Sequence, residues 1–284
     1  MKAAVYRPPV VRSLLERLRR NLVRKLCLKV LRRRGPYPAF WIMPDDIICR
    51  EILLNGYYEK ELMFGMTSLV KNRSGTVLDV GANIGNHTIF FSRSFGHVIA
   101  FEPVPRNCWI LKANLHLNSA SNVVLVEKAL GDRNEFLYLA QDDPKNTNDG
   151  LSPLADSRTG SRDRVEVARG DDVLREMMYP APVTMIKVDV EGFEWKVIKG
   201  LRETIMQYRP TIFWEAFSSQ NALETRAVLE DMGYRNFYYL TTTRFKNKYI
   251  NKLVNSVGKS VYLVSLDEVL EFDGMTLASA DPVR

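Results

Sequence analysis

The sequence predicts an α/β protein built on a doubly wound, mostly parallel sheet. From residue 76 onward, short apolar runs rich in Val and Ile alternate with amphipathic segments of helical length. Such alternation implies parallel strands joined by right-handed crossovers. The 284 residues are 46% hydrophobic and 26% charged, a globular composition, and no apolar run is long enough to span a membrane.

The expected elements follow one another in order along this part of the chain. Strands are predicted at 76–80, 97–102, 122–127, 183–189 and 211–216. Helices are predicted at 86–95, 105–117, 194–206 and 220–232, the second with a proline in its first turn. Two further strands, 236–240 and 260–265, are joined by a polar loop without a helix, so they are expected to pair as an antiparallel hairpin at the sheet edge.

A long insert, residues 128–182, separates the third predicted strand from the fourth. Residues 135–140 and 164–168 within it alternate like short strands. Residues 141–163 are rich in Asp, Asn, Ser, Thr, Gly and Pro, which predicts a loop too long for a simple connection. Two interpretations stay open for that loop: it carries substrate contacts, or it is a flexible surface segment.

The sequence divides into a basic arm (1–40), a lead-in of short helices (41–75) and the α/β domain (76–284). The first 34 residues hold twelve cations and one acid, whereas the rest of the chain has a net charge of −4. Apolar residues from Val11 to Leu31 recur at steps of three and four, which predicts a basic amphipathic helix. Gly35 and Pro36 would end it.

Several interpretations of the arm are open. Residues 11–34 could contact an anionic membrane surface as an interfacial helix, or dock on the body or on a partner. An organelle transit segment is another reading of its composition. The three cysteines and three histidines show no metal-ligand spacing, so no metal site is expected, and a reducing compartment is indicated. We therefore expect a cytoplasmic protein, with the inner membrane surface as a candidate location.

The first predicted strand ends in a glycine-containing turn, Asp79-Val-Gly-Ala-Asn-Ile-Gly85. Gly81 permits a tight turn and close backbone approach by a ligand, and Gly85 lets the next helix pack closely. The helix start offers free N–H groups to a carboxylate, and Asp79 could receive an ammonium. Glu102 ends the second strand, where an acid can accept two ribose hydroxyls.

This turn differs from a dinucleotide fingerprint. A pyrophosphate site needs G-x-G-x-x-G, but position 83 is Asn and the spacing is G-x-x-x-G. The pattern instead suits a ligand with an amino acid end, a nucleoside end and no pyrophosphate, such as S-adenosylmethionine. A nicotinamide oxidoreductase is accordingly disfavoured.

Five motifs, in order, together resemble the FkbM family of S-adenosylmethionine-dependent methyltransferases. They are Asp79 to Gly85, Phe101-Glu-Pro-Val-Pro-Arg-Asn107, Ala129-Leu-Gly131, Ile186-Lys-Val-Asp-Val-Glu-Gly192, and Arg209-Pro210 leading to Glu215. The resemblance covers about residues 76–216. It implies the Rossmann-like class I methyltransferase sheet of seven strands with a reversed last strand. Characterised members largely methylate hydroxyls, on sugars or on polyketide-type natural products.

The resemblance also implies cofactor contacts at the ends of the first three strands. The methionine end of the cofactor would contact Asp79, Gly81, Asn83 and Gly85. Glu102 would bind the ribose, and Ala129 and Leu130 would lie near the adenine. The arm lies outside the resemblance.

Candidate catalytic side chains alternate at the end of the fourth strand. If the strand stays extended, Lys187, Asp189 and Glu191 share one side. A carboxylate there could deprotonate or orient a hydroxyl, and a second carboxylate would raise the pKa of the first. The sequence does not decide whether Asp189 or Glu191 is the base. A structural role also stays open, in which one of these acids caps the next helix or pairs with Lys187. Glu215 is a weaker candidate, and His87 is expected to pack or to cap.

The sequence therefore predicts an enzyme that methylates a hydroxyl on a sugar, glycolipid or secondary metabolite, so its partner would be a small-molecule or glycan acceptor. An RNA or protein methyltransferase docked through the arm is the alternative, and a non-catalytic binding module is another. Nucleic acid is not the expected partner, because the body is net acidic and the arm has no aromatic platform for base stacking.

Overall fold

A computed structural model of the chain describes residues 39–40, 48, 51–52, 56–139, 151–152, 164–177, 182–216, 218–241, 262–265 and 274–282. The chain divides into two units, Met1–Pro38 and Ala39–Arg284, and all described residues belong to the second. The predicted amphipathic helix of the arm and most of the predicted loop 141–163 lie outside the described residues. Within those ranges, no helix has the length and apolar character needed to cross a membrane.

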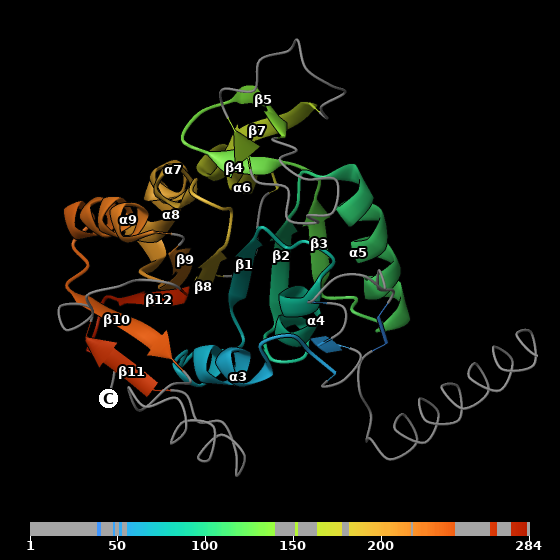
Figure 1. The fold of residues 1–284 in the computed structure, drawn as a ribbon, viewed down its shortest axis with the longest axis horizontal. Helices are drawn as coiled ribbons and strands as arrows, with labels where there is room; N and C mark the ends of the chain where they lie inside the picture. Colours follow the sequence, from blue (N-terminus) through green and yellow to red (C-terminus); the bar gives the residue numbers. More distant parts are fainter. Residues whose placement is uncertain are drawn as a thin grey trace, which may run out of the picture. The chain divides into compact units, whose positions relative to one another are not determined.

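The described residues form a main sheet of eight strands in the order β11-β10-β12-β9-β8-β1-β2-β3 (Figure 1). Its strands are β1 (Thr76–Val80), β2 (His97–Phe101), β3 (Val123–Val126), β8 (Val183–Val188), β9 (Thr211–Ala216), β10 (Asn236–Thr241), β11 (Tyr262–Ser265) and β12 (Gly274–Ser279). The pairs β3-β2, β2-β1, β1-β8 and β8-β9 are parallel. The predicted doubly wound, mostly parallel α/β sheet is therefore confirmed.

Strand order reverses beside β1. The chain runs outward from β1 to β2 and β3, and later returns to place β8 and β9 on the other side of β1. Such a switch point leaves a crevice at the carboxyl ends of the strands, because the connections leave β1 and β8 in opposite directions.

The C-terminal edge of the sheet has one strand more than predicted. The hairpin of β10 with β11 is antiparallel, as expected. The strand that lies reversed inside the sheet is β12, which pairs antiparallel with both β9 and β10. Its sequence, Gly-Met-Thr-Leu-Ala-Ser, is short and has one β-branched residue, so the local pattern did not indicate a strand.

Helices cover both faces of the sheet. They are α3 (Lys60–Ser68), α4 (Asn86–Ser92), α5 (Pro105–Leu117), α6 (Gly170–Glu176), α7 (Glu194–Gly200), α8 (Arg202–Tyr208) and α9 (Ser219–Asp231). Alternate residues of β1 separate the two layers: Leu78 and Val80 pack with α6 to α9, whereas Val77 packs with α3 and α4. All of β1 is buried, as expected for a central strand with helices on both sides. The single helix predicted at 194–206 is two helices, α7 and α8.

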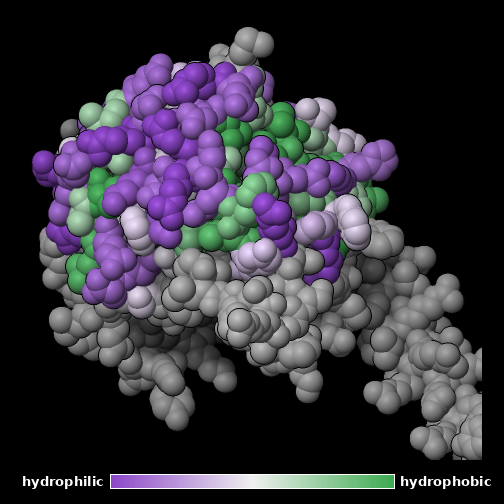
Figure 2. Space-filling view, turned by 90° about the horizontal axis from the view of Figure 1, so that it is seen from above, coloured by the Kyte–Doolittle hydropathy of each residue, from purple (hydrophilic) through white to green (hydrophobic). Residues whose placement is uncertain are grey.

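The insert forms a small second sheet in the order β4-β7-β5-β6. Its strands are β4 (Ala129–Gly131), β5 (Glu135–Leu139), β6 (Leu151–Ser152) and β7 (Arg164–Arg169). The predicted short strands 135–140 and 164–168 are thus confirmed as β5 and β7, which pair antiparallel. Seen from above, the described surface is largely hydrophilic, with apolar patches between the polar side chains (Figure 2).

Backbone contact between two glycines joins α7 to the second sheet. A Cβ atom on Gly200 would lie 1.8 Å from the carbonyl oxygen of Gly131, far inside van der Waals contact. The last turn of α7 therefore lies directly on β4, and β4 contains Ala129 and Leu130. The position of Ala129 and Leu130, two predicted ligand contacts, therefore depends on the contact at Gly200, where only a glycine fits.

We predict that Gly200→Ala lowers the free energy of unfolding by about 1–3 kcal/mol, because a backbone carbonyl cannot rotate away as a side chain can. Urea denaturation followed by circular dichroism measures the change. Lys199→Ala, at the exposed neighbouring position, serves as control and should stay within about 0.5 kcal/mol of the parent protein. Equal stability of the two variants would contradict the contact.

Candidate active site

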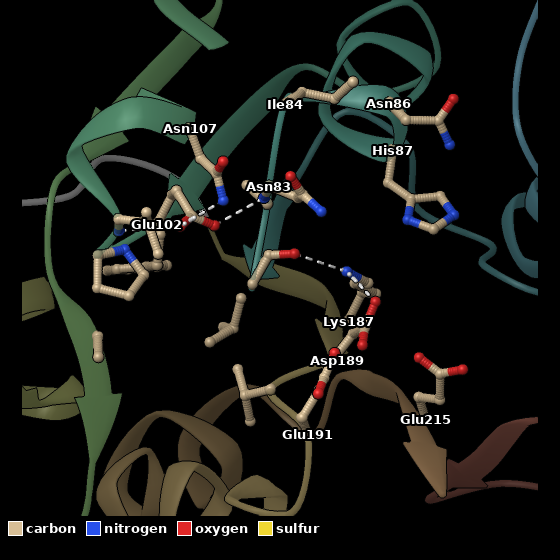
Figure 3. Close-up of a pocket in the computed structure, with 18 of the residues that line it drawn as sticks. Asn83, Ile84, Asn86, His87, Glu102, Asn107, Lys187, Asp189, Glu191 and Glu215 are labelled. Atoms are coloured by element: carbon tan, nitrogen blue, oxygen red, sulfur yellow. Dashed lines mark hydrogen bonds and ion pairs between the residues drawn. The ribbon is translucent and has the colours of Figure 1, made fainter. Parts of the chain in front are cut away.

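A pocket of about 180 Å³ lies at the carboxyl ends of the central strands, at the switch point. The segments after β1, β2 and β8 contribute to its wall, together with β4 and residues 58–59 just before α3. Of the sequence-predicted site residues, those that line it are Gly81, Asn83, Glu102, Ala129, Leu130, Lys187, Asp189, Glu191 and Glu215. Glu102 and its partners occupy one end, and Lys187, Asp189 and Glu215 the other (Figure 3).

Two of the predicted site residues, Asp79 and Gly85, do not line the pocket but lie next to residues that do. Gly85 is the residue before α4 and has φ 93°. A Cβ there would lie 2.3 Å from Cδ1 of Leu111, so this glycine allows α5 to approach α4. Asp79 is fully buried, and its Oδ2 accepts a hydrogen bond from the Thr88 hydroxyl at 2.6 Å. Neither residue lines the pocket.

The turn after β1 is pressed against the end of β8. Gly81 has φ 79°, and a Cβ on it would lie 1.8 Å from the carbonyl oxygen of Asp189. The N–H groups of Gly81 and Ala82 donate to the carbonyl of Phe101, each at 3.0 Å. A glycine is required here because both the space and the left-handed backbone exclude a side chain.

Glu102 follows β2 and is almost fully buried. Its Oε2 accepts the backbone N–H of Asn83 at 2.8 Å. Its Oε1 accepts the backbone N–H of Val104 at 2.9 Å and the side-chain amide of Asn107 at 3.3 Å. Burial raises the pKa of this carboxyl, and these three hydrogen bonds oppose the rise. A carboxylate offers about four lone-pair directions, so acceptor capacity remains toward the pocket.

The opposite end is organised by a buried lysine. Lys187 is 1% exposed, and its Nζ lies 3.2 Å from Asp189 Oδ2 and 3.4 Å from Asp79 Oδ1. The same atom donates to the carbonyl oxygen of Gly81 at 3.0 Å. Burial alone would lower the pKa of Lys187, but the two carboxylates outweigh burial and raise it. The ammonium is therefore permanently charged and surrounded by oxygen on three sides.

Asp189 and Glu215 are two neighbouring acids beside this lysine. Burial alone would raise the pKa of Asp189, but Lys187 and a hydrogen bond with Glu215 hold it below its ordinary value. The negative charge of Asp189, followed by burial, raises the pKa of Glu215 to about 9. At neutral pH, Glu215 thus keeps its proton beside an ionised Asp189. Glu215 is the second carboxylate beside Asp189, a role that the sequence suggested for Glu191.

Glu191 does not continue the alternation expected of it. The strand β8 ends at Val188, and Glu191 lies in the following turn with φ 50° and an exposed side chain. The condition that the strand stays extended is therefore not met. Glu194, the first residue of α7, holds this turn: its Oε1 accepts the N–H groups of Val190 and Gly192. Pairing with Lys187, one of the structural alternatives, is observed for Asp189.

Two pocket residues were missed as site residues by the sequence analysis. Glu59 precedes α3 and lies with Oε2 3.7 Å from Nε2 of His87. Burial, then the charge of Asp189, raises the pKa of Glu59 to about 7. Burial, then the charge of Lys187, lowers the pKa of His87 to about 4, so the ring is neutral. No local signal marks either residue, because each reaches the pocket only through packing against distant strands.

Residues with a left-handed backbone conformation are concentrated at this pocket. Five described residues other than glycine have positive φ, and three of them, Glu59, Asn83 and Glu191, line the pocket. Each such residue costs about 1–2 kcal/mol relative to ordinary backbone. Strain of this kind is concentrated where function demands a particular direction of a side chain or an N–H group. Within the described ranges, no cluster of three or more His, Cys, Asp or Glu side chains could hold a metal ion.

We predict that Lys187→Met lowers the free energy of unfolding at pH 7 by about 3–5 kcal/mol, because Asp79 and Asp189 lose the charge that compensates them. Chemical denaturation measures it. Lys128→Met is the matched control: its ion pair with Glu166 is 2.6 Å long but exposed, so the loss should be below about 1 kcal/mol. Adding Asp79→Asn to Lys187→Met should restore part of the stability, and a further loss would contradict the prediction.

Comparisons with known proteins identify the family. The family described as the methyltransferase FkbM domain matches residues 79–236, more than half of the chain. Methyltransferase sdnD of Sordaria araneosa is 31% identical over an alignment of 191 residues, and the match covers 56% of this chain and 73% of that protein. Methyltransferase 1 of Beauveria bassiana (strain ARSEF 2860) is 27% identical over an alignment of 177 residues, and the match covers 56% of this chain and 71% of that protein.

A solved structure shows the same fold. The crystal structure of methyltransferase FkbM from Methylobacillus flagellatus KT aligns with a TM-score of 0.50 and 19% identity, covering 81% of this chain. The present chain spans about half of that protein, 52% of its length. The ordered motifs, the family match across 79–236 and the shared fold lead to one conclusion: the chain belongs to the FkbM methyltransferase family.

Proposed function

We propose that this protein is an S-adenosylmethionine-dependent methyltransferase that acts on a hydroxyl of a sugar, glycolipid or secondary metabolite. One observation carries the proposal. A single pocket at the switch point has a buried carboxylate, Glu102, at one end and a charge-paired carboxylate, Asp189, at the other. The first end suits a ribose, and the second suits a hydroxyl that must be oriented and deprotonated.

The residues present fit the cofactor. Glu102 retains acceptor capacity for a ribose hydroxyl, and the buried Oδ1 of its neighbour Asn107 has no hydrogen-bond partner among the described residues. Ala129 and Leu130 supply an apolar wall for the adenine. Backbone groups of the turn at Gly81 would meet the methionine end. When bound, S-adenosylmethionine supplies an electrophilic methyl group on a positively charged sulfur.

The chain's own groups act on the acceptor. Lys187 keeps Asp189 ionised, and Asp189 can accept a hydrogen bond from a hydroxyl and hold its oxygen in line for attack. Glu191, at the exposed side of the pocket, would contact a more distant part of the acceptor. Acidic groups surround this end, and the Lys187 ammonium already faces three oxygens. A neutral hydroxyl is therefore favoured over a phosphate or carboxylate as acceptor.

The arm at residues 11–34 is proposed to bring the enzyme to an anionic membrane surface. We expect the full chain to sediment with vesicles of phosphatidylglycerol and phosphatidylcholine, and a chain lacking residues 1–34 to remain in the supernatant. Vesicles of phosphatidylcholine alone are the control and should bind weakly. Unchanged sedimentation after the deletion would contradict this assignment.

Cofactor binding tests the central proposal. By titration calorimetry, S-adenosylmethionine and its demethylated product, S-adenosylhomocysteine, should bind with micromolar affinity. Glu102→Gln should weaken both by about 10- to 100-fold, since hydrogen bonds to a charged group contribute about 1.5–3 kcal/mol each. Glu127→Gln, an exposed acid beyond β3 that does not line the pocket, should bind like the parent.

A folded protein that binds neither ligand would overturn the enzyme proposal and favour a binding module. Micromolar binding justifies a screen of acceptors that begins with sugars and hydroxylated metabolites, with S-adenosylhomocysteine formation as the signal.

A further inference from the structure

Glu59 reaches the pocket from outside the parallel sheet. It is the residue before α3, and its backbone is left-handed, with φ 53° and ψ 35°. That conformation is unfavourable for a glutamate by about 1–2 kcal/mol. The carboxylate lines the pocket and is one third exposed, with Oε2 3.7 Å from Nε2 of His87. The strained backbone thus places an acid in the pocket wall, opposite a buried imidazole.

Charged groups from several elements act on this carboxylate. From the end of β8, Asp189 repels its negative charge and Lys187 attracts it. From β9, Glu215 interacts with it electrostatically. From α4, the neutral ring of His87 faces it, slightly beyond hydrogen-bond distance, and the His87 Nε2 atom makes no hydrogen bond with any residue that the structure describes. Glu59 therefore belongs to the same charge cluster as the proposed catalytic residues.

Methylation of a hydroxyl releases one proton, which needs a base. The O–H bond of the acceptor breaks, and its oxygen forms the new bond to carbon. The electron pair of the broken C–S bond stays on sulfur. Asp189 is a weak base, because Lys187 stabilises its ionised form, and Glu215 already carries a proton. Among the acids of this cluster, Glu59 is the one poised to change protonation near neutral pH.

We propose that Glu59 is a further catalytic residue, the base that takes the acceptor's proton, and that the positive charge of the bound cofactor converts it to its ionised form. This inference rests on the proposed function. A cation entering the pocket favours the charged form of a nearby carboxylate. S-adenosylmethionine carries that cation at sulfur and S-adenosylhomocysteine does not, so the two ligands should differ in the protons that they displace.

Calorimetry in buffers of different ionisation enthalpy, such as phosphate and Tris, measures those protons. Because the pKa of Glu59 is about 7, S-adenosylmethionine should release up to about half a proton at pH 7, and S-adenosylhomocysteine close to none. Release of a proton on binding means that affinity for S-adenosylmethionine rises with pH through 7. The affinity for S-adenosylhomocysteine should change little.

Glu59→Gln should abolish the release while both ligands still bind. Glu61→Gln, an acid in the first turn of α3 that does not line the pocket, should keep it. With an acceptor from the screen, Glu59→Gln should lower kcat by about 10²- to 10⁴-fold. It should also remove the rise in kcat/KM for S-adenosylmethionine between pH 6 and 8, because kcat/KM follows the pKa of the free protein.

Equal proton release by the two ligands, or release that persists in Glu59→Gln, would overturn the assignment of Glu59 and leave the methyltransferase proposal standing. Failure of the parent protein to bind either ligand would overturn both proposals. Should Glu59→Gln fail to fold, the pH dependence in the parent decides: release must reach its maximum below pH 7, between the pKa of Glu59 in the free protein and its lowered pKa in the complex, and must vanish by pH 9, where Glu59 is already ionised. Release that is constant from pH 6 to 9 would contradict the proposal.

Discussion

The Lys187 ammonium is the interaction on which the site depends. A buried charge is costly unless several ligands compensate for it. Lys187 meets Asp79 of β1, Asp189 after β8 and the carbonyl of Gly81. These groups lie on or just after β1 and β8, the neighbouring parallel strands at which the strand order reverses. The same contacts that make burial of the lysine tolerable therefore hold the two sides of the pocket together.

One fixed positive charge also separates the proton affinities of its neighbours. Lys187 lowers the pKa of Asp189 and so helps to keep this carboxylate ionised. The negative charge of Asp189 raises the pKa of Glu215 to about 9, and it adds to the effect of burial that raises the pKa of Glu59 to about 7. Burial, with the lysine's charge, lowers the pKa of His87 to about 4. Groups of similar intrinsic acidity thus take different roles, because distance to one cation and exposure to solvent differ among them.

Glycine contacts set the shape of the pocket in a different way. At Gly81 and Gly200, backbone lies directly against the backbone of Asp189 and Gly131. The first contact brings the turn after β1 against the end of β8, and the second seats β4 on α7. Both ends of the pocket are therefore defined by main-chain packing, which leaves little freedom for the walls to move apart.

The sequence by itself determined the alternating α/β pattern, the turn from Asp79 to Gly85 and the position of Glu102, because these depend on local periodicity and on the order of residues at strand ends. Only the tertiary structure decided that β12 enters between β9 and β10, that Glu191 leaves the strand direction, and that Glu59 and His87 join Asp189. Strand insertion and proton affinity depend on partners far away in the chain, so no local pattern encodes them.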